Sequence, residues 1–162
     1  MMISLYINRH AKSSWDSGAR SDFDRPLNDR GLRDAPAMAQ KLLERGDRID
    51  AIYSSPANRA LSTARLFAKA LGIHPSDIIE VSDIYEANLR TLCTFVENID
   101  DHHKNVMIFG HNPGFSNLAN HLCDQNIYMP TCGSVKVNFA IDSWRLVSQE
   151  TGSMEWFDAP KF

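Results

Sequence analysis

Residues 105–114 read NVMIFGHNPG, and this stretch decides the fold class. The apolar run at 105–109 is typical of a strand that is buried on both faces at the centre of a parallel sheet. The glycines and the proline of 110–114 predict a sharp loop, and a helix is expected from about 115 to 123. A buried strand followed at once by a helix is the building unit of an α/β protein.

The same alternation of strands and helices extends on both sides of this stretch. Before it, the apolar patterns predict strands at 3–7, 49–53 and 78–81, and helices at 26–45, 58–71 and 88–99. After it, two strands are predicted at 134–141 and 144–147, close enough in sequence to form a hairpin. The sequence therefore predicts a three-layer α/β/α fold whose central sheet is mainly parallel, with at least one antiparallel strand.

Length and composition indicate one globular domain. The 162 residues, 43% hydrophobic and 23% charged, contain no linker-like segment, so residues 1–162 are expected to form a single domain. A net charge of −3 gives no reason to expect nucleic acid or a membrane as partner, and no apolar run approaches the ~18 residues of a membrane span. Three widely spaced cysteines and a start without a basic leader favour a cytoplasmic protein, and a monomer is favoured.

Polar residues that could take part in catalysis follow four of the predicted strands. In chain order they are Arg9 and His10, then Arg59, then Glu86, and finally His111. Because the carboxyl ends of parallel strands meet at one edge of the sheet, where ligands bind in α/β proteins, these side chains are expected to converge.

These residue types suit phosphoryl transfer. Two arginines match the geometry of a tetrahedral phosphoryl group, and a histidine beside them can attack phosphorus to form a phosphohistidine. A second imidazole, if protonated, can donate to the equatorial oxygens, and a carboxylate can protonate the leaving group and later take a proton from water. This chemistry needs no metal and no cofactor.

Each residue alone has a more ordinary explanation. Arg9-His10 is a common dipeptide, Arg59 could be a solvated helix residue, Glu86 a surface residue, and His111 part of a helix-start loop. The functional interpretation depends on their joint occurrence at successive strand ends.

The sequence resembles the histidine phosphatase superfamily, which has the phosphoglycerate mutase-like fold. The resemblance rests on Arg9-His10 after a strand, on the segment 55–64 (SPANRALSTA), and on the strand followed by 110–113 (GHNP). The opening RHAKSSW at 9–15 and the segment 24–31 (DRPLNDRG) are similar to its small SixA-type phosphohistidine phosphatase branch.

The resemblance implies a role for each residue. His10 would be the nucleophile, Arg9, Arg59 and His111 would hold the phosphoryl group, and Glu86 would be the proton donor. The chain departs from the usual Arg-His-Gly because Ala11 follows the histidine; its carbonyl is expected to hold the Nδ1–H of His10. Ser55 and Thr63 are expected to support backbone turns and the helix start.

Other chemistries fit less well. None of the cysteines has the arginine six positions later that a cysteine phosphatase needs, and no Walker A motif is present. Asp22-Phe23-Asp24 is similar to an aspartyl-phosphate motif but lies in a polar loop, and the adjacent His102-His103 is a poor metal motif on a predicted surface turn.

Spacing also bears on the substrate. Glu86 lies 22 positions after Ala64 and 25 before His111, which leaves no room for a sizeable lid. An open site suits phosphohistidine on a protein, whose leaving group is comparatively easy to displace. The alternative is a small phosphate ester as substrate, or a non-catalytic phosphate-binding adaptor.

The loop 9–33 carries six basic and four acidic residues. It is either a solvated loop or a positively charged surface that a phosphorylated partner approaches, with Trp15 as a contact. Arg25 could instead pin the loop by pairing with Asp24 or with a buried carboxylate.

Overall fold

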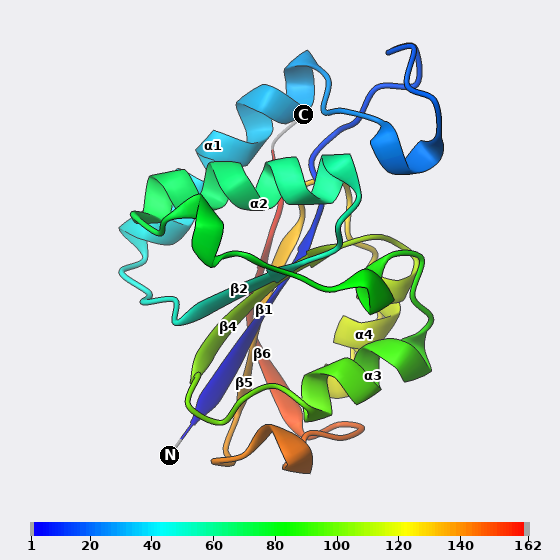
Figure 1. Cartoon of the computed structure of the whole chain (residues 1–162). Coiled ribbons are helices and arrows are strands. Elements are labelled where there is room, and N and C mark those ends of the chain that lie inside the picture. Colours follow the sequence, from blue (N-terminus) through cyan, green and yellow to red (C-terminus); the bar gives the residue numbers. More distant parts are fainter. Residues whose placement is uncertain (1, 161–162) are drawn as a thin grey trace.

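The computed structural model describes residues 2–160, which form a six-stranded sheet between two pairs of helices (Figure 1). The strands are β1 (Ile3–Arg9), β2 (Ala51–Ser54), β3 (Ile79–Glu80), β4 (Asn105–Gly110), β5 (Ser134–Phe139) and β6 (Gly152–Asp158). The α-helices are α1 (Asp29–Glu44), α2 (Asn58–Leu71), α3 (Leu89–Glu97) and α4 (Gly114–Cys123). Short 3₁₀ turns are η1 (Asp22–Asp24), η2 (Pro75–Asp77), η3 (Ser82–Ile84) and η4 (Trp144–Leu146).

The sheet confirms the predicted fold class. Its strand order is β3-β2-β4-β1-β5-β6, with parallel pairing from β3 through β1 and antiparallel pairing of β5 with both of its neighbours. Helices α1 and α2 cover one face of the sheet, and α3 and α4 cover the other (Figure 1). The result is three layers around a mainly parallel sheet.

Strand β1 shows how the sheet separates two apolar cores. Ile3, Leu5 and Ile7 pack with residues of α3 and α4, whereas Tyr6 packs with residues of α1 and α2. Successive side chains of a strand point to opposite faces, so a strand covered on both faces is apolar at nearly every position. No helix within residues 2–160 is long and apolar enough to cross a membrane.

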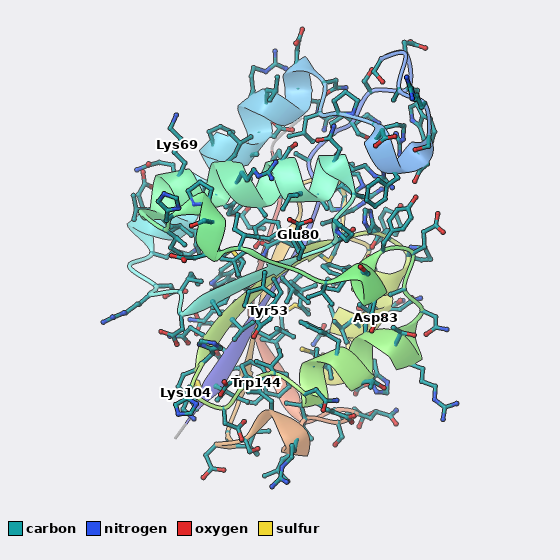
Figure 2. The ribbon with its side chains drawn as sticks, viewed as in Figure 1. Tyr53, Lys69, Glu80, Asp83, Lys104 and Trp144 are labelled. Atoms are coloured by element: carbon teal, nitrogen blue, oxygen red, sulfur yellow. The ribbon has the colours of Figure 1, made fainter. Side chains whose placement is uncertain are left out.

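The predicted strand at 144–147 is wrong. Residues Trp144–Leu146 form η4, because the main-chain N–H of Trp144 donates to Asp101 and its indole Nε1 donates to the carbonyl of His103 at 2.8 Å. Figure 2 shows Trp144 and Lys104 near each other at the end of the molecule opposite to the loop that follows β1. The hairpin partner of β5 is instead β6, which was not predicted.

Several element boundaries also differ from the prediction, among them those of α1 and β3. Helix α1 starts at Asp29, not at 26, because the side chain of Asn28 accepts from the N–H of Gly31 and caps the helix there. Strand β3 is only two residues long, so the predicted strand at 78–81 is shortened at both ends.

Candidate active site

The register of the two central strands sets the two histidines side by side. Arg9 at the end of β1 pairs with Gly110 at the end of β4, so His10 and His111 are the next residues along each strand. Their ring centroids lie 5.4 Å apart, and the N–H of His10 donates to the carbonyl of Gly110 at 3.0 Å. The carboxyl edge of the sheet therefore carries two adjacent imidazoles.

His10 is buried, with 6% of its surface exposed, and its ring is fixed by one hydrogen bond. The carbonyl of Ala11 lies 2.7 Å from its Nδ1, as expected for alanine at this position. A carbonyl can only accept, so Nδ1 carries the proton and Nε2 keeps a lone pair. The N–H of Ala11 in turn donates to Thr63 Oγ1, which itself donates to the carbonyl of Arg59. Thr63 thus supports the backbone, as expected.

His111 is buried and held by Ser55. Nε2 of His111 lies 2.8 Å from Ser55 Oγ, which also accepts from the N–H of Ala57 at the start of α2. The hydroxyl can donate its proton to Nε2, and this leaves the imidazole proton on Nδ1. Ser55 was expected to support a turn only; it also orients an imidazole of the site.

Both arginines present a nitrogen without a partner. Of the four buried side-chain nitrogens or oxygens that have no hydrogen-bond partner within residues 2–160, three are Arg9 Nε, Arg59 Nε and His111 Nδ1. Buried polar groups are normally paired, so three such nitrogens on residues gathered at one sheet edge indicate an anion site. The side chain of Arg9 is oriented by a hydrogen bond of 3.0 Å that its Nη1 donates to the carbonyl of Met129.

Glu86 borders the same cavity as His111. It follows η3 in the left-handed conformation, with φ of 53°, which is uncommon for a residue with a side chain. Its exposed side chain and His111 both line a cavity of about 310 Å³, which Asn112 and Gly114 also line. Of the five residues that the sequence indicated, His10 and His111 thus lie side by side, and Glu86 shares a cavity with His111.

The comparison with protein families agrees with this geometry. A family model described as histidine phosphatase superfamily (branch 1) matches residues 5–92, which is more than half of the chain. The chain belongs to the histidine phosphatase superfamily. This match includes Arg9, His10, α2 and Glu86 but ends before His111.

Related proteins of the superfamily differ in the extent of the match. An uncharacterised chloroplastic protein of Arabidopsis thaliana is 29% identical over 160 residues, which cover 94% of this chain and 73% of that protein. A metal-independent phosphoserine phosphatase of the same plant is 34% identical over 90 residues, or 54% of this chain and 37% of that protein. The crystal structure of a protein from Agrobacterium tumefaciens, provisionally named phosphohistidine phosphatase SixA, is 27% identical with a TM-score of 0.81, covering 98% of this chain and 99% of that one.

The electrostatics of this histidine phosphatase site keep both imidazoles neutral at neutral pH. Burial lowers the pKa of His10 to about 4, and the positive charges of Arg59 and Arg9 act in the same direction. Burial, the neighbouring His10 and Arg59 lower the pKa of His111 to about 3. At neutral pH both imidazoles of the free protein are thus neutral, which leaves a lone pair on Nε2 of His10 and a single N–H on His111.

We expect this pKa shift to be visible in stability. Between pH 6.5 and about 4 the unfolded chain binds a proton at His10 and the folded chain does not, so stability falls as the pH falls. His10→Gln removes this effect, so between pH 7 and 4.5 the variant should lose about 2–3 kcal/mol less free energy of unfolding than the wild type. Urea unfolding at the two pH values measures the difference. Equal losses in both proteins would show that the His10 pKa is not lowered.

Two residues of the site, Asp22 and Tyr85, were not indicated by the sequence as contacts of its key groups. The carboxylate of Asp22 binds Arg59 and Arg25, each at 3.0 Å, and accepts from the hydroxyl of Tyr85 at 2.8 Å. The Tyr85 ring meets the His111 ring edge-on at 5.5 Å. Arg25 does pin the loop, but through Asp22 and not through Asp24, and its guanidinium lies 3.5 Å from the centroid of the exposed Trp15 ring.

Proposed function

We propose that this protein is a phosphatase that works through a covalent phosphohistidine at Nε2 of His10. The observation that carries the proposal is the set of unpaired buried nitrogens on Arg9, Arg59 and His111, gathered around an imidazole whose Nδ1 is held by the Ala11 carbonyl. This arrangement can bind a phosphoryl dianion and present a lone pair to its phosphorus.

The reaction then runs in two displacements. Nε2 of His10 attacks phosphorus while the bond from phosphorus to the leaving group breaks, and Glu86 donates a proton to that group. A water molecule next attacks the phosphohistidine, the P–N bond breaks, and Glu86 takes a proton from the water. Inorganic phosphate leaves, and the donors of Arg9, Arg59 and His111 stabilise the charge of both transition states.

We further propose phosphohistidine on a protein as the substrate. The connection from α2 to α3 is made of η2, β3 and η3, and the Glu86 side chain on it remains exposed. An open edge of this kind admits a phosphoryl group on a protein surface, and the structural likeness to a SixA protein supports the same substrate class. The second candidate, a phosphate monoester of a small molecule, is favoured by the match to a phosphoserine phosphatase.

One experiment separates these functions. Hydrolysis of a phosphohistidine-bearing carrier protein, of phosphoserine and of an aryl phosphate is measured in the presence of EDTA. We expect all activity to survive EDTA, because arginines and imidazole supply the positive charge, and the highest kcat/KM for the phosphohistidine protein. A preference for phosphoserine would establish the second candidate, and absence of hydrolysis of all three would indicate a phosphate-binding module.

The role of Glu86 is tested by the basicity of the leaving group. General acid catalysis contributes about 10²–10⁴-fold, and it matters most where the leaving group is a strong base. Glu86→Gln should therefore slow hydrolysis of alkyl phosphates by that factor and slow aryl phosphates or phosphohistidine much less. The measurement is kcat/KM across a series of leaving groups, because this ratio reports the first displacement, in which the leaving group departs, and not the attack of water that all substrates share. Equal losses for all substrates would make Glu86 a structural residue.

A further inference from the structure

We infer that Asp22 is a positioning residue for phosphoryl transfer, which orients the Arg59 guanidinium toward the phosphoryl group bound at His10. The inference rests on the proposed function and adds to it a residue from a loop that is distant in sequence from Arg59. The two residues are 37 positions apart, on η1 and on the first turn of α2.

Asp22 holds Arg59 at two points. The main-chain carbonyl of Asp22 accepts from Arg59 Nη1 at 2.7 Å, and its Oδ2 accepts from Arg59 Nη2 at 3.0 Å. A planar guanidinium bound at both terminal nitrogens cannot rotate freely about its long side chain. These contacts leave Nε of Arg59 unused. This atom is buried and has no hydrogen-bond partner within residues 2–160.

The charge of Arg59 reaches the reacting imidazoles. After burial, it is among the causes that lower the pKa of both His10 and His111. The main chain of Arg59 is also linked through Thr63 to that of Ala11, the residue after His10. The Asp22 charge also acts on His111, whose pKa it raises, so the ion pair as a whole borders the site while Arg59 Nε is left without a partner within residues 2–160. A carboxylate that competed with the phosphoryl group would instead be expected to engage the unpaired nitrogens.

Asp22 is itself fixed from two further directions. Arg25 donates from Nε to Oδ1 at 3.0 Å, and the hydroxyl of Tyr85 donates to Oδ2 at 2.8 Å. Although burial opposes ionisation, hydrogen bonds from Tyr85 and Arg59 outweigh it and hold the pKa of the Asp22 carboxyl below its usual value. Since the Tyr85 ring also contacts His111, one carboxylate links two of the proposed phosphoryl-binding residues.

The same contacts could simply fasten the loop to α2, and Asp24 provides the matched control. Asp24 lies on the same 3₁₀ turn and carries the same charge, but its side chain accepts only from the neighbouring Ser21 hydroxyl at 3.0 Å among the bonds of residues 2–160. Asp22→Asn and Asp24→Asn thus remove equal charge from one turn, and only the first removes an ion pair with Arg59.

The experiment measures kcat and KM for Asp22→Asn and Asp24→Asn, each in the wild-type and in the Arg59→Ala background. Misplacement of a catalytic group by about 1 Å can cost about 10²-fold, so we expect Asp22→Asn to lower kcat by about 10–100-fold. KM should change less than threefold, because the arginine charge remains near the ground-state phosphoryl group. Asp24→Asn should stay within twofold of the wild type.

The double variant decides how Asp22 acts. If it acts through Arg59, Asp22→Asn should change the rate less than twofold once Arg59 is alanine. Equal factors in both backgrounds would show that Asp22 only stabilises the loop, and higher activity of Asp22→Asn would show that it competes with substrate. Either result overturns the inference while the wild type stays active, whereas an inactive wild type would contradict the proposed function itself.

Discussion

His10→Ala is expected to abolish turnover, with a loss of about 10⁴-fold or more. The only proposed route to hydrolysis passes through a bond between phosphorus and His10 Nε2, and removing a nucleophile eliminates that route for every substrate. The fold should remain, since the β1–β4 pairing depends on backbone bonds. Steady-state rates, with circular dichroism to check folding, are the measurement.

His102→Ala is the control for this variant. His102 lies on a surface turn with its side chain 92% exposed, and its Nδ1 contacts Asp100 at 2.8 Å. We expect wild-type rates from it. Turnover of His10→Ala near the wild-type level would reject His10 as nucleophile.

Arg59→Ala should give the second largest of the losses that are common to all substrates. Removing one donor that stabilises transition-state charge costs about 10²–10³-fold. Because Arg59 is proposed to hold the phosphoryl group common to all substrates, the factor should be similar for alkyl phosphates, aryl phosphates and phosphohistidine. This behaviour distinguishes it from Glu86→Gln, whose effect should depend on the leaving group.

The control for Arg59→Ala is Arg65→Ala, an exposed position on the same helix. It removes the same side chain from α2 without touching the sheet edge, so rates should stay within twofold of the wild type. A loss confined to one substrate class for Arg59→Ala would move Arg59 from phosphoryl binding to recognition of the leaving group.

Strands β1 and β4 made most of the fold predictable. Most of their side chains are buried, so their apolar runs are unambiguous, and each strand is followed directly by a histidine. Parallel pairing then brings His10 beside His111 without any further information. Arg59 and Glu86 could be placed near them because each follows a strand of the same parallel group.

The carboxyl-terminal part was less predictable because its signals are weak. Strand β6 alternates between exposed and half-buried residues at the sheet edge, and its composition does not stand out from a loop. The apolar residues of η4 suggested a strand, whereas Trp144 is buried through hydrogen bonds to a distant turn at 101–103. A contact of that kind depends on tertiary structure and leaves no periodic pattern.

Asp22 was missed for a related reason. It stands in a polar loop where charged residues are common, and nothing local distinguishes it from Asp24. Only the folding of that loop over the start of α2 brings it to Arg59. Its partner Arg25 is three residues away, but Arg59 and Tyr85 are 37 and 63 positions away, so no local spacing relates Asp22 to the site.

The covalent intermediate is the central claim, and trapping it is the most direct test. The protein is mixed with a labelled phosphoryl donor, quenched within one turnover, and the labelled peptide is identified by mass spectrometry. We predict a phosphate on His10 that is labile in acid and stable in base, present in the wild type and absent from His10→Ala. An acid-stable phosphate on a serine or a cysteine, or rapid turnover with no labelled protein at any quench time, would contradict the account.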